Sequence, residues 1–232
     1  MDTDRKWVIV RVDGKLAGIS QDYGKLAEIS AYIAQKCSDK EKYRNSGAGK
    51  SAGKLRRKRN EFPDINLPYN EITAQTASFK DILQLRQVTR WDDMIFFGTD
   101  FQRRVWKKLW ELAYNPNENA NCHEVGSTNK CKLLSYSDFA ELCKNRAGVR
   151  PVAHAIGLNP IPVIIPCHLV VPKEAIDKIN EIQRKAESTI FKGEDLCQTS
   201  ILNDNAIDFG EYALGKQLKR RLISMDILNE PE

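Results

Sequence analysis

The chain has 232 residues, of which 41% are hydrophobic and 29% charged, and its net charge is +5. This composition excludes a disordered tail, because enough apolar residues are present to bury a core, and the length suits one large domain or two small ones. No stretch approaches 18 uncharged apolar residues, and the first residues lack the apolar region of a secretory signal, so neither a membrane span nor export is expected. The mild basic excess permits binding to a polyanion without demonstrating it.

The six cysteines are scattered without a CxxC pair, which favours reduced thiols over a disulfide framework. Cys122, His123 and Cys131 lie in a polar, turn-rich stretch over residues 115–132. They are three soft ligands without a fourth, at no standard zinc spacing. We therefore expect no metal.

The first 90 residues predict an α/β N-terminal domain. Residues 6–20 indicate a β-hairpin, because two apolar or alternating runs flank Asp13-Gly14, a strong turn signal. Residues 22–37 have apolar residues at helical spacing. Residues 38–60 are rich in Gly, Ser, Lys and Arg, which is typical of a flexible basic surface segment; it either touches phosphates or is a solvated loop.

Residues 92–114 predict a short strand, Met94–Phe97, followed by a helix with Thr99 or Asp100 as its N-cap. One apolar stripe of this helix is expected in the core: Phe101, Val105, Trp106, Leu109 and Leu112. Farther on, residues 173–189 form a charged amphipathic pattern, and residues 208–228 predict a last helix.

Residues 135–160 predict two short helices with a tight connection at Gly148. Ser135 or Ser137 can cap the first helix, and Pro151 suits the first position of the second, which puts Arg150 at or near its N-cap. This is helix-turn-helix geometry, although the pattern fits packing in a helical subdomain equally well.

The run Val163–Ile165 predicts a buried strand that leads into Pro166, Cys167 and His168. A thiol becomes a strong nucleophile when a nearby base favours its thiolate. Neighbouring residues on a strand point to opposite faces, so only a turn at Pro166 would bring Cys167 and His168 into one site. From these residues alone, Cys167 is either a nucleophile or a buried structural cysteine.

A wider series of residues resembles one enzyme family, the O6-alkylguanine-DNA alkyltransferases, also called methylated-DNA–protein-cysteine methyltransferases. The series comprises Tyr136, Arg150, Asn159, the "IPCH" run, Tyr212, Gly215, Lys219 and Asp226. The family has an arginine seventeen residues before its cysteine, a tyrosine fourteen before that arginine, and an asparagine eight before the cysteine. "FGTDFQRRVW" resembles the Gly-Thr-x-Phe-Gln-x-x-Val-Trp opening of its catalytic domain. The resemblance covers about residues 94–114, 133–172 and 209–228.

The resemblance implies a catalytic set. Cys167 would accept the alkyl group, and His168 would act as the base through a water molecule. The acid behind the histidine is a glutamate in most relatives, seven residues after a helix lysine; here Lys219 plus seven is Asp226, which is one methylene shorter. Tyr212 would donate to the base oxygen as guanine leaves. If this relay works, the thiol pKa is expected below its ordinary value of about 8.5.

The resemblance also implies contacts to the substrate and to DNA. The carbonyls of Cys167 and Val170 would accept from the guanine amino group. Arg150 would enter the duplex and replace a base turned out of the stack, and Tyr136 would lie at the 3′ phosphate and help the rotation. Asn159 would brace the turn between the second helix and the strand before the cysteine.

The sequence departs from the family pattern at several places. Leu169 stands where the family has arginine, and His154 stands at a helix position where relatives usually have a small residue. Residues 115–132 and about 173–208 resemble insertions. Family members that only bind alkylated DNA carry tryptophan or alanine in place of the cysteine, so the presence of Cys167 favours the enzyme.

The expected fold is therefore an α/β N-terminal domain over residues 1–90 and a mainly α catalytic domain over residues 91–232, with a winged-helix-like helix-turn-helix. The expected function is irreversible transfer of an alkyl group from guanine O6 in double-stranded DNA to Cys167, without a cofactor. We expect a cytoplasmic monomer, associated with the nucleoid if it is bacterial, and no membrane partner. The alternatives are a protein that binds and flags alkylated DNA, and a helix-turn-helix regulator.

Overall fold

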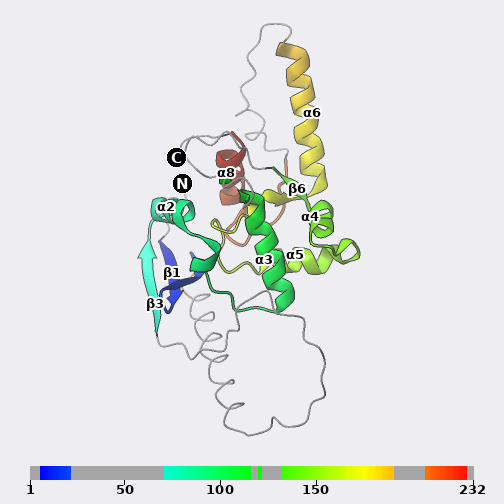
Figure 1. Ribbon diagram of the computed structural model, residues 1–232. Helices are drawn as coiled ribbons and strands as arrows, with labels where there is room; N and C mark the ends of the chain where they lie inside the picture. The colour runs from blue at the N-terminus through cyan, green and yellow to red at the C-terminus, as the bar shows by residue number, and fades with distance from the viewer. Residues whose placement is uncertain (1–5, 22–70, 116–119, 122–131, 191–206, 229–232) are drawn as a thin grey trace, which may run out of the picture.

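The computed structural model describes residues 6–21, 71–115, 120–121, 132–190 and 207–228. An antiparallel sheet with helices is followed by a mainly helical region (Figure 1). In chain order the elements are β1 (Trp7–Val12), β2 (Lys15–Ser20), β3 (Ile72–Ala77), α2 (Phe79–Val88), η2 (Trp91–Asp93), α3 (Asp100–Ala113), β4 (Tyr114–Asn115), β5 (Ala120–Asn121), β6 (Leu134–Ser135), α4 (Tyr136–Leu142), η3 (Arg146–Gly148), α5 (Val149–Gly157), η4 (Cys167–Leu169), β7 (Val170–Val171), α6 (Lys173–Ile190) and α8 (Lys216–Leu228).

The N-terminal sheet has the strand order β2-β1-β3, and both pairings are antiparallel. The predicted hairpin is confirmed: Asp13 and Gly14 have φ values of 48° and 78°, the left-handed conformations that a tight two-residue hairpin turn requires. The sequence patterns did not indicate β3 or α2. β3 is polar and exposed, and it pairs with β1 across more than fifty residues of chain.

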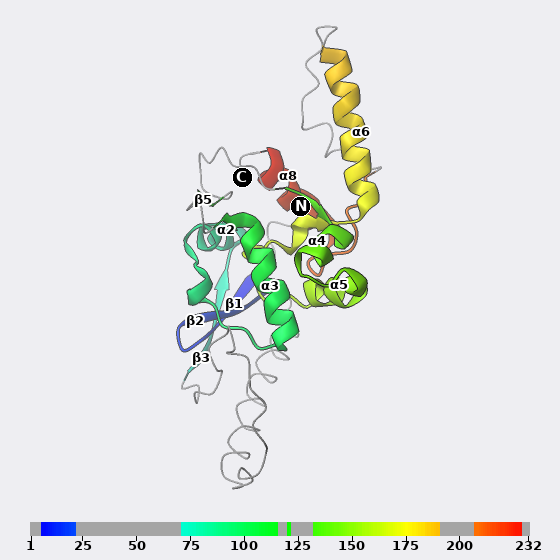
Figure 2. The same cartoon turned by 45° about the vertical axis from the view of Figure 1, so that its right-hand side comes forward.

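One hydrophobic core joins the sheet to the helical region. Trp7 of β1 stacks on Phe79 of α2 with ring centroids 5.7 Å apart. The same cluster of buried residues also contains Trp106 of α3, Val152 of α5 and Leu222 of α8. Figure 2 shows α3 between the sheet and the pair α4 and α5. The boundary at residue 90 stays a prediction, since the core crosses it.

Helix α3 begins where its sequence predicts. Thr99 is the N-cap: its hydroxyl accepts from Gln102 N at 3.2 Å, while the Gln102 side chain accepts from Thr99 N at 2.8 Å. Trp106 is buried in α3 and donates from Nε1 to the carbonyl of Ala155 at 2.8 Å, which fastens α5 to α3. The predicted strand before α3 is wrong, because among Met94–Phe97 only Met94 forms an isolated bridge, to Leu16 of β2.

Helices α4 and α5 follow one another through the short turn η3. The Ser135 side chain caps α4 by accepting from Asp138 N at 3.1 Å. Helix α5 begins at Val149 and not at Pro151, so Arg150 is its second residue and not its N-cap. Pro151 still lies in the first turn, where backbone N–H groups have no partner within the helix and a missing N–H costs nothing.

The predicted strand Val163–Ile165 is a tight buried turn. Pro162 and Ile165 form an isolated bridge, and Val163 between them has a φ of 74°. Prolines at positions 160, 162 and 166 remove backbone donors that a strand ladder would need. The aliphatic side chains of this turn are fully buried, which explains why the run resembles a core strand.

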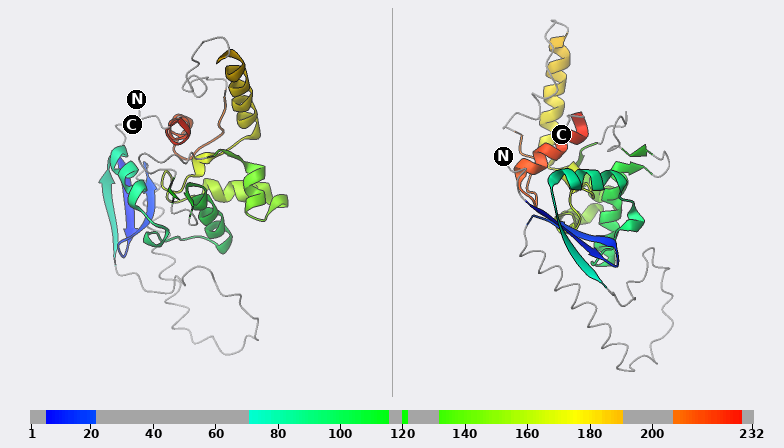
Figure 3. Two further views of the ribbon diagram at one scale, coloured as in Figure 1. Left: turned by 45° about the horizontal axis from the view of Figure 1, so that its top comes forward. Right: turned by 90° about the vertical axis from the view of Figure 1, so that its left-hand side faces the viewer.

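The C-terminal part contains two helices. α6 agrees with its predicted range and projects away from the rest of the described chain (Figures 1 and 3). α8 begins at Lys216 and not near residue 208, because Gly210 and Gly215 have φ values of 80° and 93°, which a continuing helix does not allow. None of the described helices is long and apolar enough to cross a membrane. The predicted helix over 22–37 and the basic segment 38–60 lie outside the described residues.

Candidate active site

Pro166 starts the 3-10 turn that carries the two reactive side chains. Its φ of −80° and ψ of 59° turn the chain, so Cys167 and His168 occupy successive positions of η4 and not of a strand. Successive side chains of a 3-10 turn are roughly 120° apart, not on opposite faces. The turn at Pro166 that Cys167 and His168 would need in order to share one site is therefore present.

The Cys167 thiol is 6% exposed and held by polar neighbours. Asn159 donates from Nδ2 to Cys167 Sγ at 3.0 Å and to the carbonyl of Ile165 at 3.0 Å, and its Oδ1 accepts from Ile161 N at 3.1 Å. Asn159 therefore ties the buried turn together and contacts the sulfur at the same time. The Tyr212 hydroxyl lies 4.0 Å from Sγ.

Burial decides the protonation of the thiol. It raises the pKa of Cys167 above its ordinary value, and the hydrogen bonds of Asn159 and Tyr212 and the charge of Lys219 lower it by less. The lowered thiol pKa expected from the sequence is therefore not present in the resting protein. A base has to take the proton before the sulfur can react.

His168 is fully buried, and its Nε2 lies 2.6 Å from Asp226 Oδ2. A carboxylate only accepts, so Nε2 carries the hydrogen and Nδ1 has the free lone pair. Nδ1 is buried and has no hydrogen-bond partner among the described residues. The shorter aspartate thus reaches the histidine, and it leaves the other ring nitrogen able to act as a base.

Lys219 and Asp226 lie on one face of α8, because seven residues make about two helical turns. Lys219 is buried and donates from Nζ to the carbonyl of Val170 at 3.0 Å. Burial lowers its pKa to about 8, against the opposing influence of Cys167. The Val170 carbonyl thus already accepts one hydrogen bond, and the Cys167 carbonyl accepts from Val170 N, so each oxygen has one lone pair left.

Tyr136 and Arg150, the two residues expected to contact DNA, each lie in the first turn of a helix. Tyr136 is the first residue of α4 and partly buried; burial, and to a lesser extent Cys167, raises the pKa of its hydroxyl. Arg150, in the first turn of α5, is exposed. The structure therefore brings Cys167, His168, Asp226 and their neighbours together, and places Arg150 on the surface.

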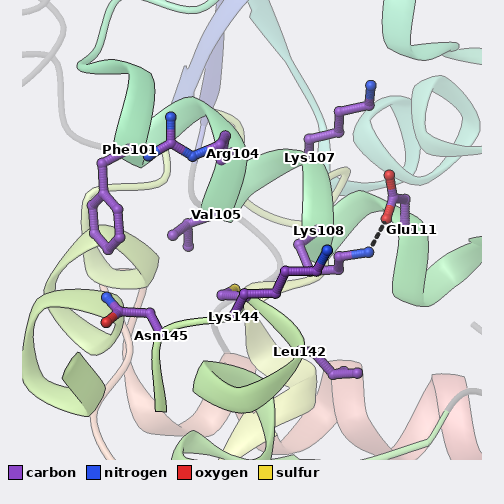
Figure 4. Close-up of a pocket in the computed structure, with 10 residues that line it drawn as sticks. Phe101, Arg104, Val105, Lys107, Lys108, Glu111, Leu142, Lys144 and Asn145 are labelled. Carbon is purple, nitrogen blue, oxygen red and sulfur yellow. Dashed lines mark hydrogen bonds and ion pairs between the residues drawn. The ribbon is translucent and has the colours of Figure 1, made fainter. Parts of the chain in front are cut away.

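A basic groove of about 680 Å³ lies between α3 and the turn after α4 (Figure 4). Four cationic side chains line it against one acidic side chain, Glu111, which pairs with Lys108. These cations are Arg104, Lys107, Lys108 and Lys144.

Among the described residues, no group of three or more His, Cys, Asp or Glu is placed to hold a metal, and Cys122, His123 and Cys131 lie outside them.

Residues 119–188 match the family model described as 6-O-methylguanine DNA methyltransferase, DNA binding domain. This segment is similar to the DNA-binding domain of the methylated-DNA–protein-cysteine methyltransferase family. The chain's curated relatives include a probable member from Acanthamoeba polyphaga mimivirus, 41% identical over 35% of this chain and 44% of the relative, and the inducible enzyme of Bacillus subtilis, 38% identical over 34% and 35%. The chain thus spans less than half the length of these family members.

Solved structures of family members are more distant. An O6-methylguanine methyltransferase of Mycobacterium tuberculosis is 23% identical, covers 66% of each chain and gives a TM-score of 0.38. OGT of the same organism, solved in complex with DNA, is 23% identical, covers 66% of this chain and 67% of that one, and gives a TM-score of 0.39.

Sequence reasoning missed one residue of the site, Arg86. Its Nη2 donates to both oxygens of Asp226, at 2.7 and 2.6 Å. The signal was present in the spacing of Phe79, Ile82, Leu83 and Arg86, which share the buried face of α2. A charged residue on a buried helix face requires a partner, although its position alone does not say which.

Proposed function

We propose that the protein repairs DNA by direct reversal, moving an alkyl group from guanine O6 in double-stranded DNA to Cys167. The observation that carries the proposal is two contacts at successive residues of η4: Asn159 Nδ2 lies 3.0 Å from Cys167 Sγ, and Asp226 Oδ2 lies 2.6 Å from His168 Nε2. These residues lie partly inside the segment that matches the family model. The protein acts as a monomer, and each molecule reacts once.

In the proposed reaction, His168 Nδ1 takes the thiol proton through a water molecule. The sulfur then forms a bond to the alkyl carbon, the bond from that carbon to O6 breaks, and its electron pair stays on guanine. Tyr212 donates to the departing base, which makes guanine a better leaving group. The departing guanine anion takes up one proton from solvent and His168 releases the thiol proton to solvent, so the products are unmodified guanine and an S-alkylcysteine, and no step requires a cofactor.

The buried thiol can meet O6 only if the nucleotide leaves the base stack. Turning a nucleotide out costs a few kcal/mol, and an inserted side chain offsets part of this cost. We infer that α4 and α5 are the two helices of a winged-helix-like helix-turn-helix, with exposed Arg150 as the inserted side chain and Tyr136 beside the 3′ phosphate. The family model that matches here describes a DNA-binding domain, which supports this placement.

The basic groove beside α4 supports phosphate binding that does not depend on sequence. Repair has to find a lesion anywhere in a duplex, so affinity is expected to come from backbone phosphates more than from base edges. The net charge of +5 agrees in sign with such a partner.

A mass spectrum tests the proposal. After incubation with duplex DNA that contains O6-methylguanine, the peptide with Cys167 is expected to gain the mass of one methylene, and Cys167→Ala is expected to abolish the gain. Cys143→Ala is the matched control, because Cys143 is the other free cysteine among the described residues and lies in the groove. Undiminished transfer in Cys167→Ala would refute the proposal. Binding of alkylated over plain DNA without any transfer would favour the flagging protein.

A further inference from the structure

Arg86 is a cation in the core of the N-terminal region. It is 4% exposed and shares the buried face of α2 with apolar side chains. The Tyr114 hydroxyl donates to the Arg86 carbonyl, which holds the end of α2 from a second direction. The guanidinium is therefore presented to the interior by a fixed backbone.

The carboxylate of Asp226 is held from two sides. Arg86 Nη2 lies 2.7 Å from Oδ1 and 2.6 Å from Oδ2, and His168 Nε2 lies 2.6 Å from the same Oδ2. Asp226 and His168 are both buried, so water cannot take the place of either contact without opening the core. A short side chain with a cation behind it has little freedom to turn away from the imidazole.

Charged and polar groups surround His168 on the elements packed against it. Asp226 and Lys219 face it from α8, Arg86 lies behind Asp226 on α2, Cys167 precedes it in η4, and the Tyr212 ring meets it edge-on at 6.5 Å. Burial is the largest cause that lowers the His168 pKa; Asp226 raises it, and the charges of Arg86 and Lys219 lower it further. One carboxylate thus faces two cations.

We propose that Arg86 is a positioning residue for the transfer reaction, whose guanidinium fixes the short Asp226 side chain against His168 and partly balances its charge. The reaction in this proposal rests on the proposed function. The coupling of Arg86 to His168 through Asp226 rests on the contacts described above.

Arg86 has two opposite effects on the reaction through Asp226. Arg86 orients Asp226, and Asp226 fixes the tautomer in which Nδ1 accepts the thiol proton. The same positive charge makes the imidazolium that forms afterwards less stable than Asp226 alone would make it. Loss of the cation is therefore expected to spoil the orientation while raising the pH at which the His168–Asp226 pair takes up a proton. An arginine that did not act on the His168–Asp226 pair would not move this pH.

Imidazole NMR provides the direct test. The chain has three histidines, so His168→Gln assigns the His168 signals. In Arg86→Met, the pair is expected to take up its proton at a pH higher by about one unit or more, because a nearby positive charge is removed. The rate of alkyl transfer from free O6-benzylguanine to Cys167 is expected to fall about 10- to 100-fold, the effect of a misplaced catalytic group. Arg86→Lys keeps the charge and is expected to titrate like the wild type and to recover part of the rate.

Two further variants make the test decisive. Arg90→Met is the matched control, because Arg90 is exposed two residues beyond the end of α2 and is expected to change neither readout. In an Asp226→Asn background, Arg86→Met is expected to cause no further loss of rate, because Arg86 acts through Asp226. This double variant also removes both buried charges and so keeps the test available if Arg86→Met alone does not fold.

The proposal is overturned if Arg86→Met does not change the pH at which the His168–Asp226 pair takes up its proton. It is also overturned if Arg86→Met slows transfer equally in the wild-type and Asp226→Asn backgrounds. If the wild type transfers no alkyl group, the proposed function fails, whereas the NMR titration still decides whether Arg86 controls the protonation of the pair.

Discussion

Asp226 reaches His168 although it is one methylene shorter than the glutamate that the family resemblance suggests. The two residues lie on α8 and η4, which pack directly against each other. The distance of 2.6 Å between Nε2 and Oδ2 leaves no room for an intervening water. The longer reach of a glutamate is thus not required here, because the helix itself lies close enough.

The buried imidazole makes the stability of the protein depend on pH. Burial lowers the pKa of His168 in the folded protein below its ordinary value of 6.5, so the unfolded state binds more protons as the pH falls below 6.5. This contribution to stability is full above pH 6.5 and is lost on acidification. The free energy of unfolding is expected to fall by up to about 1.4 kcal/mol per pH unit below that value.

Urea unfolding between pH 7.5 and 5 measures this slope. His168→Gln is expected to flatten it, and His154→Gln is the matched control, because His154 is exposed on α5. Equal slopes in the wild type and in His168→Gln would show that the buried imidazole does not control acid stability.

At the scale of elements, the first turn of α5 is where the proposed base extrusion can be tested apart from the chemistry. Arg150→Ala is expected to slow repair of duplex DNA by at least about tenfold, because an inserted side chain offsets part of the few kcal/mol that extrusion costs. Reaction with free O6-benzylguanine needs no extrusion and is expected to keep its rate. Equal losses on both substrates would refute the inserted role. Arg146→Ala, in the turn before α5, is the control for a general loss of positive charge.

Local signals predicted some of these elements and missed others for identifiable reasons. The Asp13-Gly14 turn and the Thr99 cap act within a few residues, so the sequence pattern contains them. The run Val163–Ile165 is fully buried, and burial alone does not distinguish a core strand from a core turn; the prolines around it were the better guide. β3 becomes a strand only by pairing with β1, which no local pattern records.

The site shows the same limit. The family resemblance led to Asp226, because it implies an acid seven residues after Lys219, and the two residues share one face of α8. Arg86 lies 140 residues from its carboxylate, in a part of the chain where the family resemblance is loose. Its burial on α2 indicated a partner, but only the folded chain identifies that partner as Asp226.

At the scale of the whole molecule, the basic groove and the net charge predict DNA binding that depends on salt. A protein that neutralises several phosphates loses affinity linearly on a log–log plot against salt, with a slope of about −0.9 for each phosphate. Lys107→Ala and Lys144→Ala are each expected to reduce that slope by about one, with equal effects on unrelated sequences. Titration by fluorescence anisotropy at several salt concentrations measures it. A strong sequence preference that persists at high salt would favour the regulator.

The order in which the buried charges occur along the chain has a consequence for synthesis. Arg86 leaves the ribosome well before His168, and both precede Asp226, which closes the cluster from α8. A guanidinium is costly to bury without its carboxylate, so α2 cannot dock fully while the later part of the chain is still being translated. Helix α2 is therefore expected to complete its docking only after α8, near the end of the described chain, has been made. Translation that pauses between these points would leave the apolar face of α2 exposed to chaperones.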